Sequence, residues 1–477
     1  MKVEVRQSEL RDTVVDLLVV GLYEGEPEPA GIGIVPGASK AKAAFKKLTV
    51  FHPDDPQWLL IVGLGARGDI SPERLRVAAA LAAKEAARLE ARSLAWALPE
   101  SDDPDAAAEA LVTGTVLASY RFDRFKSAVP DEAPPRLGSL ILLAPAELAD
   151  AAETARVSAT AQNRARDLQG TPANVATPTF LAERAEEIAA AHAALSVEVL
   201  GRPELEAKGM GGLLAVSQGG PQEPKLIVLR HSGGGSGPTL GFVGKGVTFD
   251  TGGISLKPGA GMQDMKMDMS GAAAVLEAVA AIAELGLPLE VIAVVPSTEN
   301  MPSGTAVKPG DVITQYNGKT VEVNNTDAEG RLILADALAY AVEQGAERIV
   351  DLATLTGAVV IALGSTYAAV IANDDALAGE VIRAGTESGE LAWRLPLHPE
   401  YKELMKGKVA DLSNLASKRK AGTITAGSFL EEFVDGKPWA HVDIAGTAWD
   451  VGRDYVGSGA SGYGVRLLVG LARHLSA

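Results

Sequence analysis

The sequence predicts an α/β protein with two domains, each built on a mostly parallel or mixed sheet flanked by helices. Strand-like apolar runs alternate with helical patterns along most of the chain, and its 477 residues exceed the roughly 150 of one typical domain. A polar-rich helical stretch over residues 146–168 separates two such series and is expected to join the domains. We therefore predict an N-terminal domain over residues 1–165, ending in this linker helix, and a C-terminal domain over residues 166–477.

The N-terminal domain is predicted from alternating elements. Ser71 is a suitable N-cap, and Pro72 suits the first position of the helix that follows it. We predict helices over residues 72–89 and 104–120, and strands over residues 14–21, 58–65, 94–98 and 137–143. This alternation favours a mostly parallel sheet.

The C-terminal domain shows the same alternation. We predict strands over residues 196–200, 225–229, 240–243, 290–295, 348–352, 367–372 and 442–445, and helices over residues 179–191, 271–285, 329–343 and 465–475. Ligands of such sheets gather outside the carboxyl ends of the strands. Motifs that follow these strands are therefore expected to converge on one edge.

Composition narrows the class of protein. The formal net charge of −17 repels phosphate backbones and anionic membranes, so nucleic acid is not the expected main ligand. The absence of cysteine excludes disulfides and thiolate metal sites. The N-terminus has no apolar signal region, and no apolar run reaches transmembrane length. We expect a soluble cytoplasmic protein without a membrane partner.

Four acidic residues lie among glycines and small apolar residues in three motifs of the C-terminal domain, which are Val243–Pro258, Met265–Gly271 and Asn325–Leu332. The acids are Asp250, Asp268, Asp327 and Glu329. An isolated buried charge is costly without a partner or a metal. No histidine lies between His231 and His398, which excludes an HExxH zinc site there. A carboxylate-rich site suits two hard or borderline cations such as Mg²⁺, Mn²⁺ or Zn²⁺.

Spacing gives three geometric expectations. In an extended loop, Asp327 and Glu329 would project to one side about 7 Å apart. Lys245 and Asp250 would lie about 17 Å apart on opposite faces of a straight strand, so the glycines around them are expected to bend the chain. Arg331 follows Asp327 by four residues and would share its face if a helix began there.

Two interpretations of these charges remain open from the residues alone. Lys245, Lys257 and Arg331 could neutralise the acids in a buried salt-bridge network. Alternatively, two metals lower the pKa of a bridging water, a lysine stabilises an oxyanion, and the arginine holds an anion or polar group. The many glycines beside the charges favour the second interpretation. Phosphoester hydrolysis fits the spacing nearly as well as amide hydrolysis.

The motifs resemble those of the leucyl (cytosol) aminopeptidase family. Asn325–Leu332 is similar to its signature octapeptide, and Gly211–Val216 and Ala353–Gly357 also match, so the resemblance covers roughly residues 160–477. It implies removal of N-terminal residues, often leucine, from peptides. It also implies one metal held by Lys245, Asp250, Asp268 and Glu329, and a second held by Asp250, Asp327 and Glu329 with the carbonyl of Asp327.

The resemblance further implies the catalytic and binding roles. Lys257 would polarise the scissile carbonyl, and Arg331 would hold a bicarbonate ion that acts as general base. Residues implied to bind substrate are Lys257, Met265, Asn325, Thr354, Leu355 and Gly357. The implied cofactors are bicarbonate and two divalent cations per subunit, Zn²⁺ or Mn²⁺ with Mg²⁺ as a further option. The implied assembly is a homohexamer, in which the divergent N-terminal domain would serve assembly or regulation.

Two rival functions remain. One is a metal-dependent phosphoesterase or amidase acting on non-peptide substrates. The other is a non-enzymatic scaffold, since some relatives bind DNA as architectural factors. The intact charged set argues against lost catalysis, and the net charge argues against extended DNA contacts.

Overall fold

The chain divides into two compact units. The computed structural model describes the chain except residues 28, 30, 31, 33, 34, 54–57, 128–134, 419 and 477. Unit 1 comprises Met1–Asn163 with Gly452–Gly457, and unit 2 comprises Arg164–Val451 with Ser458–Ala477. Helix α3 (Ala149–Gly170) contains the change from one unit to the other. The sequence did not indicate that a segment near the C-terminus belongs with unit 1, and the predicted domain roles stay predictions.

Unit 1 has a mostly parallel sheet, as expected. Its strands follow the order β1-β6-β5-β2-β4-β3, and β3 pairs with β4 in the antiparallel direction. Ser71 caps α1, its side chain accepting a hydrogen bond from the backbone N–H of Arg74. The bounds are β1 Lys2–Arg6, β2 Leu17–Tyr23, β3 Leu48–Phe51, β4 Trp58–Gly65, β5 Ser93–Ala97, β6 Ser139–Leu143, α1 Pro72–Arg88 and α2 Pro104–Ala118, with 3-10 turns Leu10–Asp12, Ala38–Lys40, Arg67–Asp69 and Ala146–Leu148.

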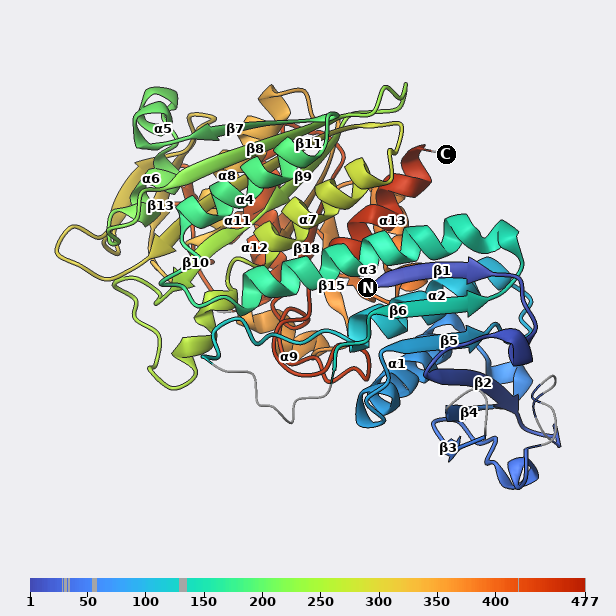
Figure 1. The fold of residues 1–477 in the computed structure, drawn as a ribbon. Helices are drawn as coiled ribbons and strands as arrows, with labels where there is room; N and C mark the ends of the chain where they lie inside the picture. The colour runs from blue at the N-terminus through green and yellow to red at the C-terminus, as the bar shows by residue number, and fades with distance from the viewer. Residues whose placement is uncertain are drawn as a thin grey trace. The chain divides into compact units, whose positions relative to one another are not determined.

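Unit 2 is built on a nine-stranded mixed sheet (Figure 1). Four adjacent strands of this sheet, in the order β18, β14, β9 and β11, run parallel to one another. Their carboxyl ends therefore lie at one edge of the sheet. The strand bounds are β7 Leu195–Leu200, β8 Lys225–Ser232, β9 Leu240–Gly244, β10 Gly246–Asp250, β11 Glu290–Asn300, β14 Arg348–Ala353, β15 Ala368–Ala372, β16 Ala392–Arg394 and β18 Trp439–Asp443. A small second sheet contains β12 Asp311–Thr314, β13 Thr320–Val323 and β17 Leu412–Ser413.

Helices cover both faces of the large sheet. Helices α4 and α7 pack on one face, and α6 and α8 pack on the other (Figure 1). The bounds are α4 Pro178–Ala191, α5 Arg202–Lys208, α6 Gly211–Ser217, α7 Ser270–Glu284, α8 Gly330–Glu343, α9 Gly357–Leu363, α10 Asp375–Ser388, α11 Pro399–Glu403, α12 Gly422–Leu430 and α13 Val465–Ser476, with 3-10 turns η5 Met262–Met267 and η6 Glu431–Phe433.

Two strands of unit 2 differ from expectation in a way that affects the edge of the sheet. The strand predicted over residues 290–295 continues to Asn300, although Pro296 lies within it. Its added residues pair with β10, which was not predicted. The register of β10 shifts between Val247 and Asp250, so the glycine-rich segment is irregular there, as the expected bend requires. The strand predicted over residues 442–445 lies at Trp439–Asp443.

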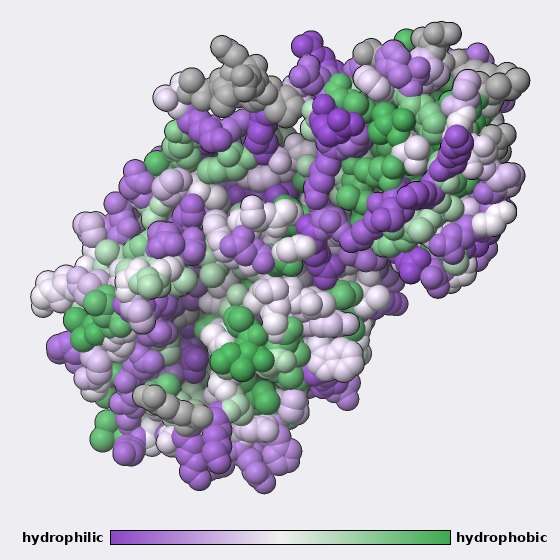
Figure 2. All heavy atoms as spheres, turned by 90° about the horizontal axis from the view of Figure 1, so that it is seen from below, coloured by the Kyte–Doolittle hydropathy of each residue, from purple (hydrophilic) through white to green (hydrophobic). Residues whose placement is uncertain are grey.

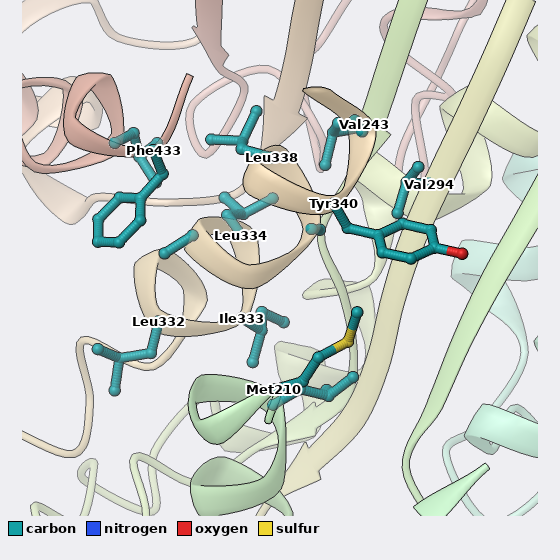
Figure 3. Packing of buried hydrophobic residues seen from close by; sticks show 14 of the residues in the cluster. Met210, Val243, Val294, Leu332, Ile333, Leu334, Leu338, Tyr340 and Phe433 are labelled. Atoms are coloured by element: carbon teal, nitrogen blue, oxygen red, sulfur yellow. The ribbon is translucent and has the colours of Figure 1, made fainter. Parts of the chain in front are cut away.

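Helix α8 is buried on nearly every side. Leu332, Ile333, Leu334, Leu338 and Tyr340 of this helix pack into one hydrophobic cluster, where strand and helix neighbours surround them (Figure 3). A helix that is apolar all round belongs in a core. The core therefore fixes the N-terminus of α8, where the signature octapeptide ends.

The surface is mixed in character. In the view of Figure 2, hydrophilic side chains are interspersed with smaller hydrophobic groups. Within the part of the chain that the structure describes, no helix is both long enough and apolar enough to cross a membrane.

Asp336 fastens α8 to two neighbouring segments, which gives a first prediction. Its carboxylate is fully buried and accepts hydrogen bonds from the N–H groups of Leu213 (2.9 Å) and Tyr316 (2.8 Å). We expect Asp336→Asn to lower the free energy of unfolding by about 1–3 kcal/mol at pH 5, because the amide nitrogen would face a backbone donor. Thermal unfolding of wild type and Asp336→Asn at pH 5 and pH 8 measures this loss of stability.

The same comparison has a defined pH dependence. Burial raises the pKa of Asp336 to about 7, above its unfolded value. The contribution of the Asp336 carboxyl group to the free energy of unfolding is therefore fully present below about pH 4 and is lost as pH rises through 7. The difference in free energy of unfolding between wild type and Asp336→Asn should become smaller from pH 5 to pH 8. A difference that stays constant or widens would contradict this assignment.

Candidate active site

Lys245 lies at the closed end of a buried charge cluster. It follows β9, and its backbone is fixed by hydrogen bonds to Leu352 and Ala272. Its Nζ donates to Asp268 Oδ1 (2.7 Å) and lies 2.8 Å from Glu329 Oε1. All three side chains are almost fully buried. One ammonium group thus links residues from the first, second and third motifs.

Lys257 forms a second centre at the more open end. Its Nζ lies 2.5 Å from Asp250 Oδ2 and also contacts Asp327 Oδ1. The side chains of Lys257 and Asp327 are 23% and 34% exposed, against 3% for Lys245. A substrate can therefore approach this end of the cluster.

One carboxylate oxygen from each of Asp250, Asp327 and Glu329 lies within 4.8 Å of the other two. The expectation of an extended loop with 7 Å between Asp327 and Glu329 is wrong, because Glu329 has helical backbone angles. Helix α8 begins only at Gly330, so the expected helical face shared by Asp327 and Arg331 is also wrong.

Burial and mutual repulsion control the charges. Burial raises the pKa of Asp268 well above its ordinary value. Burial, and after it the negative charge of Glu329, also raises the pKa of Asp250. Burial acts to lower the pKa of Lys245, but the carboxylates of Asp268 and Glu329 outweigh it and raise that pKa. Both lysines therefore stay charged while they face these acids.

The donor set fits divalent cations. Four carboxyl groups face two lysine ammonium groups, so the acids outnumber the lysines by two. Among the described residues, Glu329 Oε2 is buried and accepts no hydrogen bond, whereas the buried Asp268 Oδ2 lies 2.7 Å from Lys245 Nζ. By contrast, Asp250 Oδ1 and Asp268 Oδ1 each accept two hydrogen bonds from the protein. Hydrogen bonds thus fix one oxygen of Asp250 and one of Asp268, which is how ligating carboxylates are oriented.

Arg331 lies in the first turn of α8 and is nearly buried. One terminal nitrogen of its guanidinium donates to the carbonyl of Asn414 at 2.9 Å, and its Nε has no hydrogen-bond partner among the described residues. Burial lowers its pKa to about 10, against the opposing effect of Glu329 and Asp443, so it remains a cation near neutral pH. A buried cation with an unpartnered donor suits an anion.

Two residues predicted to bind substrate form hydrogen bonds within the cluster. The Thr354 hydroxyl donates to Asp268 Oδ1 at 2.7 Å, and its carbonyl accepts from Lys245 at 3.0 Å. Asn325 Oδ1 accepts from the N–H of Asp327 at 3.0 Å. Contact of either residue with substrate stays a prediction.

The other residues predicted to bind substrate surround the cluster. Met265 is half-buried in η5, the turn that leads into Asp268. Leu355 donates its N–H to Asp443 at 3.1 Å and packs against the core, while Gly357 begins α9. The backbone N–H of Asp268 donates to the carbonyl of Met265 at 3.3 Å, so η5 is tied directly to this acid.

Sequence reasoning missed three residues that support the site. Asn300 at the end of β11 bonds to Asp250, and Asn414 donates to the carbonyl of Asn325 at 2.7 Å. Buried Asp443 accepts from Thr356 and from backbone N–H groups after β14. A prediction that β11 continues to residue 300 would have placed Asn300 beside the charged motifs, at the same edge of the large sheet. The positions of Asn414 and Asp443 carry no comparable signal.

Comparison with known protein families shows to which family this chain belongs. The model of the cytosol aminopeptidase family, catalytic domain, matches residues 163–469, and that of its N-terminal domain matches residues 38–128. The chain belongs to the cytosol aminopeptidase family. This cytosol aminopeptidase is therefore a metal-dependent exopeptidase that acts on peptides.

Relatives match this chain over almost its whole length. A probable cytosol aminopeptidase of Roseiflexus castenholzii is 46% identical over 483 residues and covers 98% of each chain. One of Alkaliphilus oremlandii is 41% identical over 500 residues and covers 100% of each chain. The solved structure of the bottromycin maturation enzyme BotP in complex with Mn has a TM-score of 0.89 at 35% identity, covering 97% of this chain and 100% of that chain.

The contact between Gly330 and Lys245 gives a second prediction. A Cβ at Gly330 would lie 2.7 Å from Lys245 Cε and 2.9 Å from its Nζ. We expect Gly330→Ala to lower the free energy of unfolding by about 1–3 kcal/mol through this crowding, although alanine favours a helix. Gly304→Ala is the matched control, because a Cβ there meets nothing within 4 Å. Equal unfolding midpoints for the two variants would refute the close approach.

Proposed function

We propose that this cytosol aminopeptidase is a two-metal leucyl aminopeptidase, which removes N-terminal leucine or other apolar residues from peptides. The observation that carries the proposal is the largely buried cluster of four carboxylates and two lysines, in which Glu329 Oε2 has no partner. Structural salt bridges normally balance their charges and satisfy their oxygens. This cluster does neither, which favours cations as its missing partners.

Each acid of the cluster has a proposed place in the metal centre. Lys245, Asp250, Asp268 and Glu329 would hold one cation, and Asp250, Asp327 and Glu329 the other, with the Asp327 carbonyl. The short separations around Lys245 and within the second set support these groupings. Two bound cations would supply Lewis-acid polarisation of the substrate carbonyl and lower the pKa of water. Lys245 would have to give up its proton to ligate.

Mn²⁺ and Zn²⁺ are the proposed cations, with Mg²⁺ as a further option. Oxygen-rich sites with one nitrogen ligand suit all three to different degrees. The similar solved structure in complex with Mn supports Mn²⁺ as the first metal to test.

Lys257 is proposed to stabilise the developing oxyanion. Burial acts to lower its pKa, but Asp250 and Glu329 outweigh that effect and raise it. Lys257 is thus a charged donor and not a base near neutral pH. Its partial exposure beside Asp327 lets its ammonium group reach a substrate carbonyl.

Arg331 is proposed to hold bicarbonate, which would supply a general base close to the scissile bond. The unpartnered Nε and the buried positive charge support anion binding at this position. Met265, Asn325, Thr354, Leu355 and Gly357 are proposed to line the path of the N-terminal residue. Their positions around the cluster are compatible with a pocket for an apolar side chain.

The assembly and setting are also proposals. We infer a homohexamer in the cytoplasm, with residues 166–477 as the catalytic domain and residues 1–165 serving assembly or regulation. The two compact units and the separate match of a family N-terminal domain support a division of labour between the two parts.

The activity itself gives a third prediction. Purified protein should release leucine from a leucyl anilide, lose this activity on treatment with a chelator, and regain it with Mn²⁺ or Zn²⁺. A phosphoester and an anilide that carries no N-terminal amino acid serve as control substrates and should not be turned over. Failure to release leucine with any divalent cation would refute the proposed reaction.

The role of Lys257 gives a fourth prediction. Lys257→Ala should lower kcat by about 10²–10³ while metal content stays unchanged, because one oxyanion donor contributes about that much. Lys308→Ala, which removes an exposed lysine paired with Asp311, is the control and should retain activity. Steady-state kinetics and metal analysis of both variants provide the test. An unchanged kcat in Lys257→Ala would contradict the proposal that Lys257 stabilises the oxyanion.

A further inference from the structure

Asn300 is a buried amide at the edge of the large sheet, at the end of β11 and opposite Asp250 in the strand register. It is 1% exposed, and its carbonyl accepts hydrogen bonds from the N–H and hydroxyl of Thr251. The backbone of Asn300 therefore fixes the segment that follows Asp250. Its side chain is left to face the charge cluster.

The amide nitrogen of Asn300 makes two hydrogen bonds to two different loops. It donates to Asp250 Oδ1 at 2.9 Å and to the carbonyl of Thr326 at 3.0 Å. An asparagine amide has two N–H donors, so both bonds can form at once. Among side chains of this size, serine and aspartate cannot make the same pair of donations.

The first of these bonds determines which oxygen Asp250 presents. Its Oδ1 is held by Asn300 and by the N–H of Gly252 at 2.9 Å, so Oδ2 is the oxygen that faces Lys257. The second bond fixes the carbonyl that directly precedes Asp327. One side chain thus sets the distance between the loops that carry Asp250 and Asp327.

The carbonyl end of Asn300 is equally confined. A Cβ at Gly253, where φ is +63°, would lie 2.8 Å from Asn300 Oδ1. The side chain is therefore enclosed between the loop of the first motif and the octapeptide. A smaller residue would leave both loops without this connection.

We propose that Asn300 is a positioning residue for the metal centre, which orients Asp250 and joins the two ligand loops before any cation binds. This inference rests on the proposed function, because it takes Asp250 and Asp327 as metal ligands. Residues that orient ligands in this way typically change metal affinity by about 10–100-fold when they are removed. Asn300 itself need not contact the cation or the substrate.

The test compares two asparagines that use their side chains in a similar way. Asn373 accepts a hydrogen bond from Trp439 and donates one to the carbonyl of Lys437, away from the charge cluster. Asn300→Ala and Asn373→Ala each remove two side-chain hydrogen bonds. Stripped full-length proteins are titrated with MnCl₂ by calorimetry, and their unfolding temperatures are measured without metal.

We expect Asn300→Ala to raise the Kd for Mn²⁺ by about 10–100-fold, while Asn373→Ala stays within about twofold of wild type. Asn300→Leu has a similar volume and no donors, adds no charge, and provides the same test of Mn²⁺ affinity if the alanine variant does not fold. A Kd within twofold of wild type for a folded Asn300 variant overturns the inference. If wild type itself binds no Mn²⁺, the proposed metal centre fails first, which is a distinguishable result.

Discussion

An excess of buried negative charge is the constraint on which the catalytic unit depends. Asp250, Asp268 and Glu329 are 5% exposed or less, and their only ionic partners among the described residues are the two lysines. Removing charges from water costs several kcal/mol per ion unless partners compensate. The fold meets part of this cost with hydrogen bonds to selected carboxylate oxygens, and the proposed cations would compensate the remainder.

Close backbone packing explains why glycines accompany these charges. A Cβ at Gly271 would lie 2.0 Å from the carbonyl of Leu352, and Gly330 lies against the side chain of Lys245. Gly252 has a φ of +86°, which glycine tolerates at little cost. The glycines thus let β9, α7 and α8 approach one another until the charged side chains meet. Their abundance in the motifs reflects packing as well as chain reversal.

The support of the site comes from segments far from the motifs. Asn300 reaches the octapeptide from β11, and Asn414 reaches it from beyond β17. Asp443 at the end of β18 holds the chain after β14. These polar residues act through hydrogen bonds that only the paired strands make possible. The geometry of the charged residues is therefore a property of the whole sheet.

The sequence by itself determined the alternating α/β pattern, the cap at Ser71 and the family, because these depend on local periodicity and on motifs contiguous in the chain. Tertiary structure alone decided how the acids meet. The helical turn at Glu329 brings its carboxylate close to Asp327, and the continuation of β11 past Pro296 places Asn300 between two loops. Spacing along the chain cannot give these positions, since strand register and helix start set them.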